Sequence, residues 1–167
     1  MNTPCEISSA VTLVSLADYT RPELIIPQLR ETDPAGIIEE LSFRLRAHAM
    51  VGDVLTFYND VINREFLSNS AMSAGIATPH ARSAQVRRLT MAVGRAPEPV
   101  VWGMRGSRPV ELVFLIAVPS TDAVDCFSVL SGIANLGGQS KILAHLRVAS
   151  DAQEIFELLK ERNPLPG

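Results

Sequence analysis

Cysteine is scarce in this chain, and basic residues do not outnumber acidic ones. The 167 residues include two cysteines, Cys5 and Cys126, and carry a formal net charge of -3. Cys5 lies in a polar N-terminal stretch and Cys126 at the expected start of a helix, so we expect two thiols rather than a structural disulfide. A nucleic-acid partner is not expected, because a protein that binds nucleic acid needs a basic face.

Long apolar runs are also missing. None approaches the ~20 residues needed to cross a bilayer, and residues 1–5 lack the charged and apolar regions of a signal peptide. We therefore expect a cytoplasmic protein without direct membrane insertion. The composition, 47% hydrophobic and 20% charged, is typical of one domain with a sizeable buried core.

The chain is interpreted as one domain between two short tails. Residues 1–12 are small and polar and are expected to form a disordered N-terminal extension. Residues 13–163 are expected to form the single domain, and residues 164–167, which contain two prolines, a frayed C-terminus.

Two helices are predicted in the first half of the chain. Asp33 is a suitable N-cap with a proline at the next position, and apolar residues recur on one face of the segment that follows. A second helix is predicted from about Asp53 to Arg64. Its last turn would place Arg64 beside the following loop, where a cation also complements the helix dipole.

Strands are predicted at residues 24–29, 89–93 and 110–118. Pro27 places the first at an edge, while the nearly continuous apolar run of the third predicts a central strand covered on both faces. Residues 94–109 are rich in Gly, Pro and Arg, which favours a turn-bearing connection that could include a short strand at 100–102. Trp102, the only tryptophan, is expected to be a partly buried packing residue.

The last third of the chain predicts a loop at residues 120–124 followed by helices. The first of these helices shows an apolar stripe of Phe127, Leu130, Ile133 and Ala134. A capping box of Ser150 and Gln153 would begin the last helix. Buried strands interleaved with amphipathic helices predict an α/β fold, a three-layer α/β/α sandwich.

The segment with the clearest chemical character is residues 75–82, Gly-Ile-Ala-Thr-Pro-His-Ala-Arg. Pro79 fixes its own backbone and favours extended geometry at Thr78, so His80 is presented from a stiff, non-helical element. A lone histidine is most often an ordinary surface or core residue. Here, however, residues 66–97 contain four arginines and no acidic residue. That setting favours an anion such as phosphate over a metal, which would need several ligands, and we expect neither a metal nor a cofactor.

These residues resemble the Gly-Ile-Ala-x-Pro-His-x-Arg signature of the enzyme IIA domains of the fructose/mannitol class of the sugar phosphotransferase system. Nitrogen-regulatory IIA proteins belong to the same group. The likeness runs from about Ser15 to Lys160 and includes the segments Leu16-Ala17-Asp18, Asn63-Arg64-Glu65 and Val113-Phe114-Leu115-Ile116-Ala117-Val118-Pro119.

The resemblance implies a mixed sheet with His80 in a shallow depression. It also implies that His80 accepts a phosphoryl group from a phosphorylated HPr-type carrier and passes it to a IIB cysteine, while Arg64 holds the phosphate. The protein would then be a phosphotransferase component rather than a stand-alone metabolic enzyme.

Two positions depart from the family pattern. Cys126 stands where the family has a second histidine, and it is interpreted as a small buried hydrophobe, as a redox-sensitive or phosphoryl-accepting thiol, or as simple loss of that histidine. The glycine-rich run before the signature has become Ser-Asn-Ser-Ala-Met-Ser-Ala, in which Ser70 retains a hydroxyl at the family's threonine position. Arg82 is a secondary candidate, for phosphate or for partner recognition.

Three functions remain open at this point. No IIB or membrane segment accompanies the domain, which favours a nitrogen-regulatory-like role in which phosphorylation changes the binding of a regulated target protein. The alternatives are a sugar-specific IIA component that passes phosphate to a IIB domain, and a transfer-defective IIA-like protein-binding scaffold.

Overall fold

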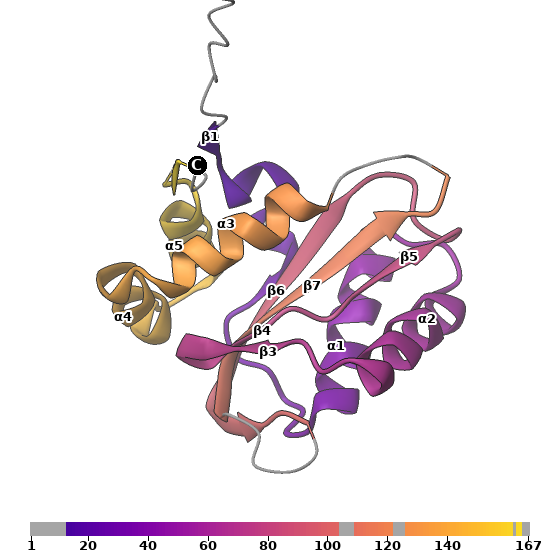
Figure 1. Ribbon diagram of the computed structural model, residues 1–167, viewed down its shortest axis with the longest axis horizontal. Coiled ribbons are helices and arrows are strands. Elements are labelled where there is room, and N and C mark those ends of the chain that lie inside the picture. The colour runs from indigo at the N-terminus through magenta and orange to yellow at the C-terminus, as the bar shows by residue number, and fades with distance from the viewer. Residues whose placement is uncertain (1–12, 104–108, 122–125, 162, 165–167) are drawn as a thin grey trace, which may run out of the picture.

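The computed structural model describes residues 13–103, 109–121, 126–161 and 163–164, and its centre is a six-stranded mixed sheet (Figure 1). The strand order is β2-β6-β7-β4-β3, with β5 also paired to β7. The strands are β2 (Ile25–Ile26), β3 (Ala71–Met72), β4 (Ile76–Ala77), β5 (His80–Ser83), β6 (Thr90–Val101) and β7 (Pro109–Pro119). The predicted edge strand is β2, and the predicted central strand is β7.

Helices α1 (Pro34–Ala47) and α2 (Val54–Leu67) cover one face of the sheet (Figure 1). Both begin where the sequence predicted. The Asp33 carboxylate accepts a hydrogen bond from the Gly36 amide, and the Asp53 carboxylate accepts two from the first turn of α2. Such caps satisfy amides that have no partner inside the helix.

Helices α3 (Phe127–Gly137), α4 (Ser140–Val148) and α5 (Ala152–Leu159) cover the opposite face (Figure 1). The three-layer α/β/α prediction is therefore confirmed.

Short 3-10 helices, η1 (Leu16–Tyr19), η2 (Pro22–Leu24) and η3 (Ser73–Gly75), complete the domain, and β1 (Leu13–Val14) pairs with β8 (Asn163–Pro164). Pro164 thus lies in a strand although residues 164–167 were expected to fray, while residues 1–12 and 165–167 lie outside the described residues.

Strand β6 is longer than predicted. Residues 94–101, expected as part of a connection, extend the strand, and its pairing with β7 shifts between Arg95 and Val100. Pro97 and Pro99 fall inside this irregular interval, where a residue without a backbone N–H costs the sheet no regular hydrogen bond. Residues 104–108 of the predicted connection, and 122–124 of the predicted loop, lie outside the described residues.

The core consists of two hydrophobic clusters, one on each side of the sheet. Strand β7 contributes to both, which explains why its sequence is apolar at almost every position.

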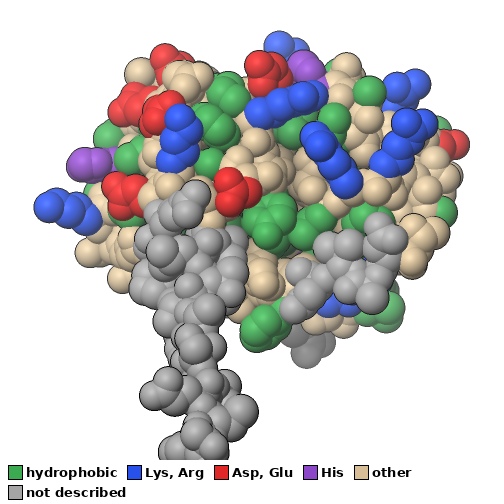
Figure 2. All heavy atoms as spheres, turned by 90° about the horizontal axis from the view of Figure 1, so that it is seen from above, with side chains coloured by type: hydrophobic (Ala, Val, Ile, Leu, Met, Phe, Trp, Pro, Cys, Tyr) green, Lys and Arg blue, Asp and Glu red, His purple; other side chains and the backbone are tan. Residues whose placement is uncertain are grey.

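On the surface seen from above in Figure 2, Lys and Arg side chains gather on the right half of the face, and most of the visible Asp and Glu lie on the left. Within the described residues, no helix combines the length and the apolarity that crossing a membrane would require.

The predicted apolar stripe of α3 was right for Leu130 and Ile133 and wrong for Phe127 and Ala134. Phe127 is 69% exposed and Ala134 is exposed, and the buried residues of the helix are Val129, Gly132, Ile133 and Leu136. The apolar residues of α3 occupy more than one face, so their spacing alone did not decide which face meets the sheet.

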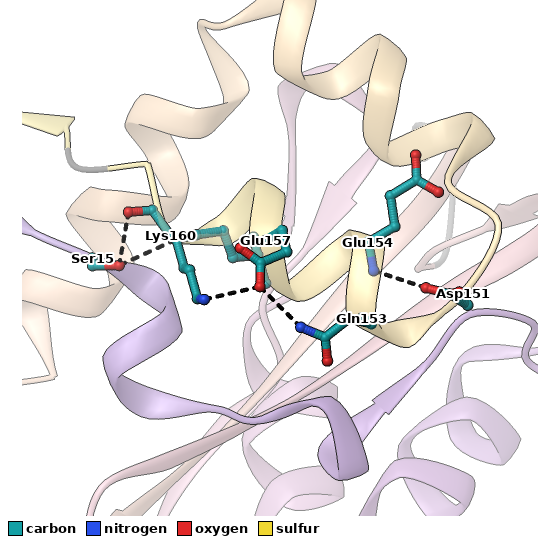
Figure 3. A network of polar contacts seen from close by, with 7 residues as sticks. Ser15, Asp151, Gln153, Glu154, Glu157 and Lys160 are labelled. Carbon is teal, nitrogen blue, oxygen red and sulfur yellow. Dashed lines mark hydrogen bonds and ion pairs between the residues drawn. The ribbon is translucent and has the colours of Figure 1, made fainter.

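The predicted cap of the last helix was wrong by one residue. Asp151 is the N-cap of α5, and its carboxylate accepts the Glu154 amide at 2.8 Å (Figure 3). The Glu154 carboxylate in turn accepts the amide and the hydroxyl of Ser150. An ionised carboxylate at the cap also suits the positive end of the helix dipole, which a serine hydroxyl does not.

The same view shows how the beginning of the domain is fixed to its end. The Ser15 hydroxyl lies 3.3 Å from the carbonyl oxygens of both Leu159 and Lys160, at the end of α5 (Figure 3). Ser15 is buried, so its hydroxyl needs such a partner.

Candidate functional site

His80 is the first residue of β5, directly after a break in the sheet. Strands β4 and β5 both run parallel to β7, and Thr78 and Pro79 separate them. The Pro79 carbonyl accepts a hydrogen bond from the Ile116 amide at 2.9 Å, so the chain remains attached to β7 across the break. His80 is therefore presented from an extended, firmly held segment, as predicted.

Both ring nitrogens of His80 have partners. Nδ1 lies 2.7 Å from the Thr78 carbonyl oxygen, and the Arg64 Nε–H donates to Nε2 at 2.9 Å. A carbonyl oxygen only accepts hydrogen bonds, so Nδ1 carries the ring proton and Nε2 presents a lone pair. The contacts thus assign the neutral tautomer that has its free electron pair on Nε2.

The surroundings of His80 favour this neutral form. The side chain is half-buried, and burial, which penalises the charged ring, is the main cause that lowers its pKa from the usual 6.5. The positive charge of Arg64 lowers the pKa further, whereas the Thr78 carbonyl and the Glu65 carboxylate act in the opposite direction. A neutral imidazole at pH 7 is the form that can act as a nucleophile.

Arg64 reaches His80 from the last turn of α2, sixteen positions earlier in the chain. Its Nε is engaged by His80, while its terminal nitrogens make no hydrogen bond to any described residue. The guanidinium borders a shallow hollow of about 320 Å³ beside β5. The other residues that line this hollow are Asp60, Asn63, Leu67, Ser68, Ala81 and Arg82.

Glu65, which the sequence interpretation did not select, connects this site to the core. Its Oε1 accepts hydrogen bonds from the Ser70 amide at 2.9 Å, the Ser70 hydroxyl at 3.0 Å and the Trp102 indole N–H at 2.8 Å. Trp102 is fully buried, so its single polar atom requires an acceptor. That requirement was the signal in the sequence, but it did not identify Glu65 as the acceptor.

Ser70 takes part in the site in a way that the sequence did not predict. Its hydroxyl donates to Glu65, and its carbonyl accepts the Thr78 amide at 3.2 Å. Because the Thr78 carbonyl holds His80 Nδ1, Ser70 helps to fix the orientation of the imidazole through the backbone. A continuous series of hydrogen bonds thus runs from Trp102 to His80.

In the described part of the chain, neither Arg82 nor Cys126 is hydrogen-bonded to the imidazole, whose partners are Arg64 and Thr78. The Arg82 guanidinium contacts the Pro119 carbonyl at 3.4 Å, at the end of β7. Cys126 immediately precedes α3 as a free, partly buried thiol that packs against the hydrophobic cluster beneath α3–α5. In register, His80 lies opposite Ile116, whose side chain belongs to that same cluster, so His80 and α3 share a face of the sheet.

Within the described part of the chain, no group of three or more His, Cys, Asp or Glu side chains is arranged to hold a metal ion. The polar groups that contact the His80 imidazole are the Arg64 guanidinium and the Thr78 carbonyl, and the Glu65 carboxylate is connected to them through Ser70. A neutral ring nitrogen beside a guanidinium is suited to accept a phosphoryl group.

Two curated proteins show the sequence relationship. The nitrogen regulatory protein of Bradyrhizobium diazoefficiens is 28% identical over 145 residues, which cover 86% of this chain and 94% of that protein. The 2-O-alpha-mannosyl-D-glycerate-specific EIIABC component of the phosphotransferase system of Escherichia coli K12 is 27% identical over 152 residues. These cover 90% of this chain, which spans 23% of the length of that component.

A solved structure shares the fold. The complex of enzyme IIA mannitol with phosphorylated enzyme IIB mannitol from Escherichia coli contains a chain that matches with a TM-score of 0.71 and 19% identity. The match covers 82% of this chain and 94% of that chain. The model of the family described as "Phosphoenolpyruvate-dependent sugar phosphotransferase system, EIIA 2" matches residues 18–162. A match over that much of the domain, together with the fold, shows that the chain belongs to this EIIA family.

Proposed function

We propose that the chain is a histidine phosphocarrier that accepts a phosphoryl group on His80 Nε2 from a phosphorylated HPr-type protein, in a nitrogen-regulatory-like role. The observation that carries the proposal is the pair of contacts on the ring. Thr78 fixes the proton on Nδ1, and Arg64 places a guanidinium beside the lone pair of Nε2.

The chemistry follows from these contacts. The Nε2 lone pair forms the new bond to phosphorus while the bond from phosphorus to the donor's histidine nitrogen breaks, and that nitrogen keeps the electron pair. The Nδ1 proton stays in its hydrogen bond to Thr78, where the carbonyl dipole stabilises positive charge that develops on the ring. No proton therefore has to leave the site during the transfer.

Arg64 has a different partner before and after the transfer. Its hydrogen bond to Nε2 must be released when phosphorus takes that position, and the guanidinium can then bind the phosphoryl oxygens with its terminal nitrogens. A phosphoryl group carries a charge of about minus two at neutral pH, so this contact is worth roughly 1.5–3 kcal/mol. Attraction between Arg64 and the transferred group thus favours the phosphorylated state.

Partners are proposed from the setting of the site and from the relatives. The ring is half-buried and its partner Arg64 borders a shallow hollow, so another protein's active site can approach, which suits exchange between carriers. The mannitol IIA was solved with a phosphorylated IIB, which supports a IIB domain as one recipient. The similarity to a nitrogen regulatory protein over nearly all of that protein's length supports a regulated target protein instead.

The test is phosphoryl loading followed by mass measurement. Incubation with enzyme I, HPr and phosphoenolpyruvate should add one acid-labile phosphoryl group, and nitrogen NMR should locate it on Nε2. His80→Ala should stay unmodified, whereas His145→Gln, at an exposed position on α4, should load like the wild type. An unmodified wild type would show that the proposal is wrong and leave the scaffold alternative, and a labelled His80→Ala variant would show that another residue accepts the phosphoryl group.

A second measurement separates the regulatory role from the sugar-specific alternative. Phosphorylated protein is mixed with a panel of IIB domains, and the loss of the label is followed with time. Slow discharge to every IIB supports regulation. Rapid discharge to one of them supports the sugar-specific alternative, and a mannosylglycerate-specific component is among the relatives.

A further inference from the structure

A second cavity lies away from the hollow beside His80 and shares no lining residue with it. It has a volume of about 220 Å³ and lies between the η1–η2 segment and the connection from β5 to β6. The polar or charged side chains in its lining are those of Asp18, Tyr19, Thr20, Arg21, Arg88 and Thr90.

The donors around this cavity are incompletely paired. The Thr20 hydroxyl and the Arg21 Nε are buried atoms that have no hydrogen-bond partner among the described residues. The Glu23 carboxylate lies 3.9 Å from Arg21 Nε, too far for a hydrogen bond. A buried donor without a partner costs about 1–3 kcal/mol, so two such atoms at one cavity are unusual in a folded domain.

Arg88 adds a further charge to the same wall. Its side chain is exposed and makes no hydrogen bond or ion pair with any described residue. By contrast, the Thr90 hydroxyl donates to the Tyr19 carbonyl, and one Arg21 terminal nitrogen donates to the His48 carbonyl. The donors of the lining that have no hydrogen-bond partner among the described residues are therefore the Arg88 guanidinium, the Thr20 hydroxyl and the Arg21 Nε, which lies within ion-pair distance of Glu23.

We propose that this cavity binds a small oxyanion, a carboxylate or phosphate compound, through Arg21, Arg88 and the Thr20 hydroxyl. Guanidiniums bind planar carboxylates and phosphates with paired N–H groups, and a hydroxyl supplies a third donor. The Asp18 carboxylate borders the same space and repels an anion, so it weakens binding unless the ligand carries a donor of its own.

The cavity lies close to a contact between the connection after β5 and the beginning of α2. The connection that carries Arg88 also holds the beginning of α2, because Gln85 accepts hydrogen bonds from the Gly52 and Asp53 amides. Met50, which precedes this contact, lines the cavity as well. The site therefore adjoins the connection that follows the strand of His80, and this connection is hydrogen-bonded to the beginning of the helix that carries Arg64.

The test is a titration of the full chain by amide NMR with inorganic phosphate, lactate and, as a neutral control, glycerol. Phosphate or lactate should shift the amide signals of Thr20, Leu89 and Thr90 with a dissociation constant of about 1 mM or tighter, and glycerol should not. If only phosphate or only lactate binds, that result shows whether the ligand is a phosphate or a carboxylate compound. If neither anion shifts these signals, the proposal is wrong.

Matched variants distinguish binding of the anion in this cavity from its general attraction to basic side chains on the surface. Arg88→Gln should weaken binding about tenfold, whereas Arg87→Gln, the neighbouring exposed position outside the cavity, should have little effect. Equal weakening by both would overturn the proposal. Asp18→Asn should strengthen binding because it removes a negative charge.

Thr20→Val separates the effect of the hydroxyl on anion binding from its effect on the stability of the fold. The valine removes a hydroxyl that lacks a partner, so the fold should be as stable as the wild type or more stable, while oxyanion binding weakens. A Thr20→Val variant that binds the anions as tightly as the wild type would remove this hydroxyl from the site. These titrations use no phosphoryl donor, so their failure and the failure of His80 loading can be told apart.

Discussion

The end of α2 and the start of α3 differ in how many hydrogen bonds their side chains make. Where α2 meets β5, Arg64, Glu65, Ser70 and Thr78 join in hydrogen bonds that fix the imidazole. At the start of α3, Cys126 caps the helix without any side-chain hydrogen bond. The groups proposed to accept and hold a phosphoryl group are thus joined by hydrogen bonds, whereas Cys126, which the sequence resemblance places at a second-histidine position, is a thiol that cannot carry positive charge.

The largest effect is expected from Arg64→Ala, which removes the cation from the hydrogen-bonded site where α2 meets β5. Loss of a charge-assisted contact of roughly 1.5–3 kcal/mol should slow loading from HPr by about 10- to 100-fold. The fold should change little, because an exposed arginine contributes less than about 1 kcal/mol to stability. Stopped-time mass measurement gives the rate, with Arg87→Ala as the control, and a rate equal to the wild type would remove Arg64 from the site.

A smaller effect is expected from Glu65→Gln, which preserves the shape of the acceptor but removes its charge. One carboxylate oxygen accepts three hydrogen bonds here, so unfolding should become easier by about 1–3 kcal/mol. Loading should slow several-fold because Ser70 and Thr78 lose some of their order. The single indole N–H signal of Trp102 reports the loss directly.

Glu39→Gln, at an exposed position on α1, is the matched control for Glu65→Gln. If the two variants had equal stability and equal loading rates, the hydrogen bonds around Glu65 would have no measurable part in the site.

The pH dependence of loading should follow the lowered pKa of His80. Loading should be constant near neutral pH and fall on acidification below 6.5, since only the neutral ring has a free electron pair. Because folding lowers this pKa, the stability that His80 contributes is present above 6.5 and is lost as the pH falls towards the folded-state value. Ring NMR titration measures the pKa directly.

Arg64→Ala sharpens the pH test. Removing the neighbouring positive charge should raise the pKa of His80, but only part of the way, because burial is the larger cause of the shift. A pKa that stays unchanged or falls in the variant would contradict the electrostatic role of Arg64.

The smallest effect is expected from Cys126→His, which changes the start of α3, where the side chain of residue 126 makes no capping hydrogen bond. If a second imidazole assists onward transfer, the variant should discharge to a IIB domain a few-fold faster while loading from HPr stays unchanged. Cys126→Ala separates gain of histidine from loss of the thiol. A wild type that discharges as fast as the histidine variant would mean that the cysteine is a neutral replacement.

Elements with local signals were the best predicted. The starts of α1 and α2 followed from Asp33 and Asp53, because a cap and its helix lie within a few residues of each other. The central position of β7 followed from its apolar run. The full length of β6 did not follow, because pairing with β7 allows a strand to continue through prolines that the sequence alone marks as a turn.

The sequence by itself determined the layered α/β fold, the membership of His80 in a recognisable signature and the candidacy of Arg64. Only the tertiary structure decided that Arg64 meets Nε2, that Ser70 acts through its carbonyl, and that Glu65 joins Ser70 to Trp102. The physical reason is distance along the chain. Caps and periodic faces are set by neighbouring residues, whereas these contacts join residues up to 37 positions apart and exist only after the helices have packed on the sheet.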